Sequence, residues 1–163
     1  MGAVAVLIIG TFIAAQWRTS KISESELATR NTAQKIAGAR IDLVTVAKDI
    51  QINVIQVQQW LTDISATRAL DGLNDGFDVA AEQAPAFAVT IKRAEGLAAK
   101  LNLTEIFVAL KALKADFPAY YAAGKKMATG CVDDGPEMGN PMMAGFDGAA
   151  VRLNGRLDAL LFI

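Results

Sequence analysis

The apolar positions form two successive patterns over the first seventy residues. Residues 2–15 are apolar apart from Thr11 and a few glycines, and a tryptophan and two basic residues follow them. From residue 22 onward one row recurs at every seventh position: Ile22, Thr29, Ile36, Leu43, Ile50, Val57 and Ile64. A second row accompanies it: Ala33, Ala47, Val54 and Leu61. This heptad spacing predicts one long helix that ends near Leu70 and packs against its neighbours with a gentle left-handed supercoil.

The apolar run at the N-terminus has three interpretations. As a helix it is roughly 24 Å long, a little short of the ~30 Å hydrocarbon core of a bilayer. We expect a membrane anchor over residues 1–17, because Trp17 suits the interface, and Arg18 and Lys21 follow it. A signal peptide would need basic residues before the run, and none are present there. An export helix of the pilin type is disfavoured because no acidic residue lies near its start.

Three shorter amphipathic segments follow the long helix. Residues 71–76 break it with two glycines among Asp and Asn, and a second helix follows to about Leu101. Pro85 either kinks this helix or marks a later start near Gln83. A third helix is expected after Thr104, a candidate N-cap residue, and Gly130 is expected to close it.

The fourth helix is expected to follow a turn-rich connection over residues 131–136. Asn140 would be its N-cap residue and Pro141 its first helical residue, and the apolar stripe continues to Leu161. Strand-like alternation is absent from the sequence. The fold class predicted is therefore all-α, an antiparallel up-down-up-down four-helix bundle whose long first helix is continuous with the anchor. We expect two domains, the anchor at 1–17 and the bundle at 18–163.

This topology places both the 71–76 and the 131–136 connections at the end far from the membrane. The first helix extends roughly 75 Å beyond the anchor, whereas the other three are each near 36 Å. The four-helix section therefore covers only part of the first helix. A second copy of the chain is the simplest partner for the rest, so we expect a homodimer through the first helix.

Composition excludes several classes of function. The chain has 16 basic and 17 acidic residues, so a basic surface for nucleic acid is not expected. Histidine is absent, which excludes catalytic triads, His-ligated haem and the usual His-containing zinc sites. Cys131 is the only cysteine, and a soft-metal site with the nearby methionines is disfavoured against ordinary core packing. We expect no enzymatic activity, no cofactor and no metal.

Two groups of residues are candidates for binding a small ligand. Trp60 and Arg68, near the end of the first helix, could grip a carboxylate, because guanidinium pairs with it bidentately. Alternatively, Trp60 fills the core and Arg68 pairs with Asp71. Asp71 and Asp75, with other acids of the two connections, could recognise a cation, or simply be solvated residues near helix N-termini. The candidate ligand-binding residues are therefore Trp60, Arg68, Asp71 and Asp75.

Two segments resemble a known family. They are residues 57–78, which include Trp60, Arg68 and the 71–76 break, and residues 135–147, which run from Gly135 to Asp147. In order, and with the N-terminal run included, they resemble the extracytoplasmic sensor region of bacterial methyl-accepting chemotaxis proteins. The resemblance implies a dimeric helical module in the periplasm, anchored in the bacterial inner membrane. It also implies a second membrane span, a relay module and a cytoplasmic signalling hairpin after the bundle.

Two functions from different classes therefore remain open. The first is a non-enzymatic sensor region that detects a small ligand or partner and relays the event to the membrane by small helix shifts. The second is a single-pass structural or accessory subunit of a larger membrane complex or filament. The amide-rich stretch over residues 51–59 fits the second as well as it fits a sensor.

Overall fold

The computed structural model describes the backbone of residues 2–161 and the side chains of residue 21 and residues 24–160. Over this range the chain forms four α-helices and no strand. The helices are α1 (Gly2–Thr67), α2 (Gly76–Lys100), α3 (Thr104–Asp133) and α4 (Pro136–Leu161). The all-α class predicted from the sequence is confirmed, with four helices in the predicted order.

The chain divides into two compact units, residues 1–40 and residues 41–163. In the first unit the described side chains are exposed, except that Ala39 is half-buried. The Thr29 and Thr32 hydroxyls each donate to the carbonyl four residues earlier, at 2.8 Å. The predicted anchor over residues 1–17 lies outside the described side chains. No helix in the described part of the chain has a stretch apolar enough to cross a membrane.

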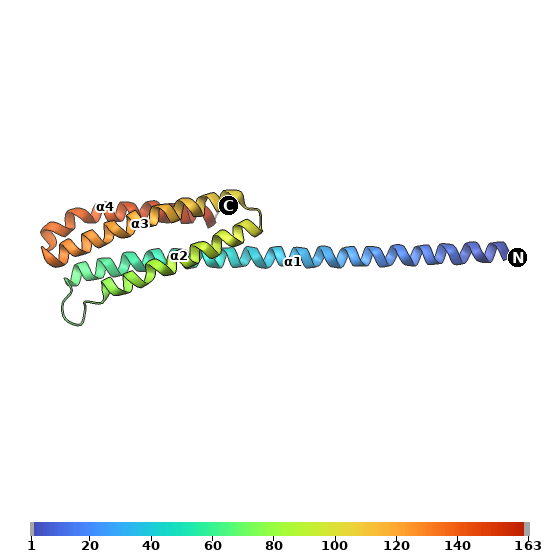
Figure 1. The fold of residues 1–163 in the computed structure, drawn as a ribbon, viewed down its shortest axis with the longest axis horizontal. Helices are drawn as coiled ribbons and strands as arrows, with labels where there is room; N and C mark the ends of the chain where they lie inside the picture. The colour runs from blue at the N-terminus through green and yellow to red at the C-terminus, as the bar shows by residue number, and fades with distance from the viewer. Residues whose placement is uncertain (1, 162–163) are drawn as a thin grey trace. The chain divides into compact units, whose positions relative to one another are not determined.

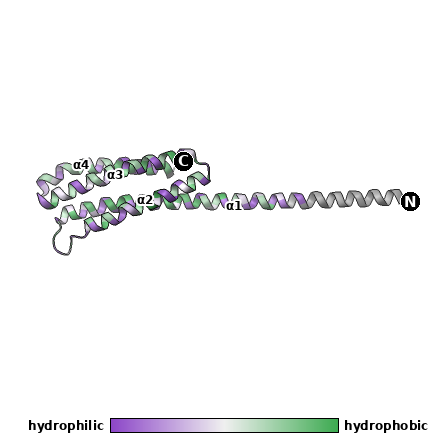
Figure 2. Ribbon diagram, viewed as in Figure 1, coloured by the Kyte–Doolittle hydropathy of each residue, from purple (hydrophilic) through white to green (hydrophobic). Residues whose placement is uncertain are grey.

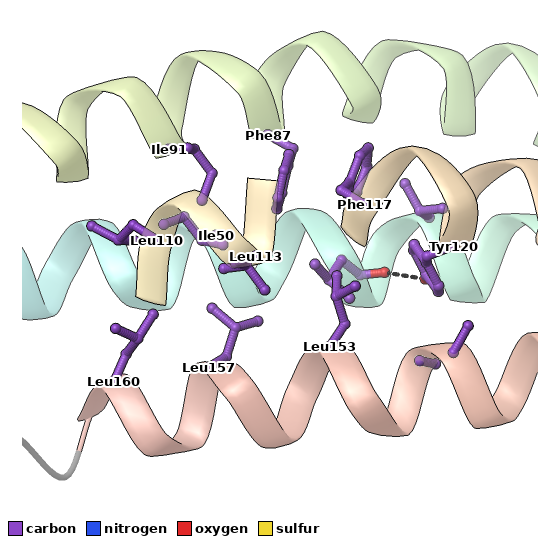
Figure 3. Packing of buried hydrophobic residues seen from close by; sticks show 14 of the residues in the cluster. Ile50, Phe87, Ile91, Leu110, Leu113, Phe117, Tyr120, Leu153, Leu157 and Leu160 are labelled. Carbon is purple, nitrogen blue, oxygen red and sulfur yellow. Dashed lines mark hydrogen bonds between the residues drawn. The ribbon is translucent and has the colours of Figure 1, made fainter. Parts of the chain in front are cut away.

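The core lies in the second unit and draws on all four helices (Figure 1). From Leu43 onward, both heptad rows of α1 are buried, so this part of the predicted seam is confirmed as a packing face. In Figure 3, Leu153, Leu157 and Leu160 of α4 point towards the interior. Leucine and isoleucine from the other helices meet them there, as amphipathic helices require. Figure 2 shows the consequence as green and purple bands along each helix of this unit.

Aromatic rings fill the middle of the core. Phe87 and Phe117 stack with ring centroids 3.8 Å apart, and Tyr120 lies 5.1 Å from Phe146. The Tyr120 hydroxyl donates a 2.8 Å hydrogen bond to the Val54 carbonyl, drawn as the dashed line in Figure 3. Burial raises the pKa of Tyr120 far above its ordinary value of 10.0, so the ring stays neutral. This bond satisfies the one polar atom that the ring brings into the core.

The helix boundaries around residue 70 differ in detail from the prediction. α1 ends at Thr67 rather than near Leu70, because Arg68 and Ala69 take positive φ angles of 53° and 52°. α2 begins at Gly76 and contains Pro85, so the later start near Gln83 is wrong.

The prediction for α3 and its connection to α4 was wrong at three points. Thr104 is the first helical residue and Leu103 precedes it without a side-chain cap, so Thr104 is not the N-cap. Gly130 does not close α3, which continues to Asp133, because this glycine is buried where Gly139 approaches. α4 begins at Pro136, so Pro136 rather than Pro141 takes the first helical position. Pro141 lies inside α4 instead.

Specific contacts show the register between helices. Asn53 of α1 donates to Gln83 and accepts from Thr90, both on α2, at 3.1 and 3.3 Å. Lys114 of α3 pairs with Glu95 of α2 at 3.4 Å. Arg156 of α4 pairs with Asp116 of α3 at 2.8 Å. These contacts record which positions of neighbouring helices face each other, although the ion pairs at the surface each contribute at most about 1 kcal/mol.

Candidate functional site

The end of α1 and the start of α2 border a small, open pocket, here called the Trp60 pocket. Its volume is about 180 Å³. Seven residues line it: Trp60, Asp63, Ile64, Thr67, Leu73, Asp75 and Gly76. Two of the four candidate ligand-binding residues, Trp60 and Asp75, therefore line the same pocket, although they are fifteen positions apart in the sequence.

Three local features hold this pocket together. The Thr67 hydroxyl donates to the Leu73 carbonyl at 3.1 Å, which ties the connection back to the end of α1. The Trp60 indole Nε1 donates to Gln56 Oε1 at 3.0 Å, so the orientation of the ring is set from within α1. Gly76 lets α2 begin against α1, since a Cβ there would lie 2.7 Å from the Trp60 carbonyl oxygen.

The charge of the pocket is negative. Asp63 and Asp75 stand on its wall, and neither Lys nor Arg lines it. The two ion pairs among the described residues involve Glu95 and Asp116, so neither pocket carboxylate has a basic partner in this part of the chain. An indole beside two carboxylates favours an organic ammonium ion, which is attracted by the ring face and by the negative charge together.

Arg68 and Asp71 do not line this pocket. The Arg68 guanidinium instead lies beside the connection between α3 and α4, where a Cβ on Gly135 would be 3.7 Å from Arg68 Nη2. Arg68 and Asp71 form no ion pair in the described part of the chain. The ends of α1 and α3 thus lie near each other. Trp60 and Arg68 do not line a common pocket, so the predicted binding of a carboxylate by these two residues together has no site.

The remaining candidates for metal chemistry are dispersed. No group of three or more Asp, Glu or Cys side chains in the described residues is arranged to hold a metal ion. Cys131 is a free, buried thiol within α3, not in a connection as the sequence suggested. Gly139 of α4 packs directly against it. Met127 is also buried, whereas Met138 is exposed, so these two sulfur atoms lie in different environments.

A second hollow, here called the Arg152 groove, lies between α3 and α4 and was not expected from the sequence. Its volume is about 350 Å³. Its lining is Ala115, Asp116, Ala119, Tyr120, Ala123, Gly145, Ala149, Arg152, Leu153 and Arg156. The available signal was the spacing of four between Ala115, Ala119 and Ala123, and again between Arg152 and Arg156. Without the register between the helices, neither row predicts that the other faces it.

The chain was compared with known families, proteins and structures. No protein-family model, curated protein or solved structure matches it. The resemblance to chemoreceptor sensor regions therefore stays a prediction that the two sequence segments carry.

Proposed function

We propose that this chain is a non-enzymatic, extracytoplasmic sensor region of a transmembrane chemoreceptor, with its bundle in the periplasm of a bacterium and its anchor in the inner membrane. It detects a small ligand and relays the event through small shifts of its helices. The observation that carries the proposal is the position of Trp60. This residue belongs to α1 and also lines the pocket, so a ligand in the pocket would contact α1 directly.

An up-down-up-down topology is part of the proposal. Asn53 of α1 is hydrogen-bonded to Gln83 and Thr90 of α2, whereas Trp60 lies next to Gly76. Higher residue numbers on α1 therefore face lower residue numbers on α2. Between α2 and α3, Phe87 packs on Phe117 whereas Glu95 pairs with Lys114. Between α3 and α4, Asp116 pairs with Arg156 whereas Tyr120 packs near Phe146, so the order is reversed in both cases. This reversed order is expected for neighbouring helices that run antiparallel. In such a topology the Trp60 pocket and the α3–α4 connection lie at the same end of the bundle.

The first prediction concerns a small alkylammonium ion, with n-butylammonium as the probe. We expect it to bind the full chain, and the Trp60→Leu and Asp75→Asn changes each to weaken binding about threefold. Asp75 is exposed and Trp60 is half-buried, so a cation–π contact and a carboxylate contact are each worth roughly 0.5–1 kcal/mol here, and 1.4 kcal/mol corresponds to tenfold. Isothermal titration calorimetry measures the dissociation constants.

Asp78→Asn is the matched control for this titration. Asp78 is an exposed aspartate in the first turn of α2, and it does not line the pocket. The control variant is expected to bind the probe nearly as the natural chain does. If Asp75→Asn and Asp78→Asn weakened the binding of n-butylammonium equally, the binding would reflect only general attraction of a cation by an acidic surface. No binding at all would refute an ammonium site at Trp60.

A homodimer through α1 is the second part of the proposal. The heptad rows from Leu43 to Ile64 are buried inside the bundle and are therefore not available to a partner. A different row of α1 is exposed and apolar: Ile41, Val44, Ile52 and Ile55. At 3.6 residues per turn these four positions share one face, opposite Ile50 and Val57. This outer stripe is the surface that a second α1 would cover.

The second prediction is the mass of the chain in mild detergent. We expect a dimer of the 17.3 kDa chain, and a monomer after the double change Ile52→Glu and Ile55→Glu, because facing carboxylates repel in an apolar seam. Light scattering after size exclusion gives the mass. Val89→Glu with Val151→Glu is the control, since both valines are 70% exposed on other helices. A dimer that survives the stripe variant would place the interface elsewhere.

The structural-subunit function remains the second candidate, and the outer stripe is the observation that favours it. An exposed apolar helix face serves a filament or a hetero-complex as well as it serves a dimer. The same mass measurement separates the two functions. An open series of larger species would support the subunit, whereas a closed dimer that also binds the ammonium probe would support the sensor.

A further inference from the structure

The lining of the Arg152 groove combines apolar residues with two arginines. The apolar part consists of Tyr120, Leu153, four alanines and one glycine, and it draws on both helices. Tyr120 is only 1% exposed and its hydroxyl donates to the Val54 carbonyl, so it adds no free polar atom to the groove. At about 350 Å³, the groove falls within the roughly 300–1,000 Å³ range of small-molecule sites.

The two arginines of the groove differ in whether they form an ion pair. Arg156 Nε is held by Asp116 Oδ2 at 2.8 Å, so its charge is partly compensated. Arg152, one turn earlier on α4, forms no ion pair with any described residue. With two guanidinium groups and one carboxylate, the groove carries one net positive charge at neutral pH.

This combination selects for one class of ligand. A planar carboxylate matches the paired N–H donors of a guanidinium, so Arg152 provides the recognition of charge. The alanine lining offers no hydrogen-bonding side chain, so the rest of the ligand must be apolar to gain from burial there. Asp116 repels a second negative charge on the ligand, which disfavours dianions.

We propose that the Arg152 groove binds a small monocarboxylate with an apolar body, its carboxylate on Arg152 and its body on the alanines between α3 and α4. This site is separate from the Trp60 pocket and does not depend on the function proposed above. A ligand here contacts α3 and α4 at once. Within a sensor it would therefore act on α4, whereas a ligand at Trp60 acts on α1.

Benzoate is the probe, titrated into the full ¹⁵N-labelled chain and followed by amide chemical shifts. We expect saturable shifts at Ala119, Gly145 and Ala149. Acetate has the same charge without the body, and benzyl alcohol has the body without the charge. Both comparators are expected to bind at least tenfold more weakly than benzoate. If acetate bound as tightly as benzoate, the apolar body would play no part in recognition. If benzyl alcohol did, the carboxylate would play none, and either result would overturn the proposal.

Three variants test the assignment of residues. Arg152→Gln removes the free guanidinium, and Ala119→Leu fills the groove without changing the charge, so each is expected to weaken benzoate at least tenfold. Asp116→Asn releases Arg156 from its ion pair and is expected to tighten benzoate severalfold. Ala88→Leu, at an exposed position of α2 outside every described hollow, is the matched control and should leave the affinity unchanged.

The outcomes are distinct from those for the Trp60 pocket. Arg152→Gln is expected to leave the amide shifts of α1 and α2 unchanged, so the loss of benzoate binding alone would not reflect unfolding. Benzoate shifts that are absent, that lie away from α3 and α4, or that survive Arg152→Gln would overturn the groove proposal. None of these results would bear on whether the Trp60 pocket binds an ammonium ion.

Discussion

Replacing Gly139 by alanine is expected to lower the free energy of unfolding by about 3 kcal/mol. A Cβ at this position would overlap the Cys131 thiol and lie 2.7 Å from the Cys131 amide nitrogen and 2.9 Å from its Cα. The side chain can turn away, but the two backbone atoms belong to α3 and cannot move without shifting the helix. Overpacking of a rigid core typically costs roughly 1–3 kcal/mol, and backbone displacement puts this site at the upper end.

Gly155→Ala is the matched control for this change. Gly155 lies on the same helix, and nothing comes within 4 Å of a Cβ built there. Alanine is expected to stabilise the chain at that position by up to about 1 kcal/mol, because it reduces the entropy lost on forming a helix. Urea unfolding followed by circular dichroism measures both variants. A Gly139→Ala variant as stable as the natural chain would mean that α3 and α4 are not in close contact at Cys131.

The same contact explains where the sequence-based prediction stopped. The heptad rows identified the buried face of α1 from Leu43 to Ile64, because apolar periodicity reports directly which side of a helix is covered. Gly130 gave a misleading signal, because local rules interpret a glycine at the end of an apolar stripe as a helix end. The actual role of Gly130 and Gly139 is to let α3 and α4 approach each other, which depends on a neighbouring helix that local rules do not consider. The α4 start was placed five residues late because Asn140 and Pro141 match the local pattern of a helix start.

The candidate site was predictable to a similar extent. The chemistry of Trp60 and Asp75 identifies them as candidates, and the turn between α1 and α2 brings them to one pocket. Arg68 is a candidate because it is near Trp60 in the sequence, but its positive φ directs the chain out of the helix and its guanidinium lies beside Gly135. Helical periodicity cannot predict a residue just past the helix end. The Arg152 groove needed the register of α3 against α4, which the sequence alone does not contain.

Truncation of Phe146 to alanine is the other change with a large expected effect, a loss of about 4 kcal/mol. Phe146 is fully buried on α4, stacks near Tyr120, and occupies the space beside Gly124, where a Cβ would lie 2.5 Å from its ring. Removing a buried phenylalanine side chain costs roughly 3–5 kcal/mol, because both the transfer free energy and the contacts around the cavity are lost. Val151→Ala, at a position 70% exposed on the same helix, should change stability by less than about 0.5 kcal/mol.

A double-mutant cycle tests whether Gly124 is there to admit this ring. Gly124→Ala alone is expected to destabilise the chain, because its new methyl group meets the Phe146 ring and the Leu61 side chain. In the Phe146→Ala background the ring is gone, so the same methyl group enters the cavity and its cost should fall by at least about 1 kcal/mol. Urea unfolding of the four proteins gives the coupling free energy. Additive losses would show that Gly124 and Phe146 do not share a packing site, and the close approach of α3 to α4 would then need another explanation.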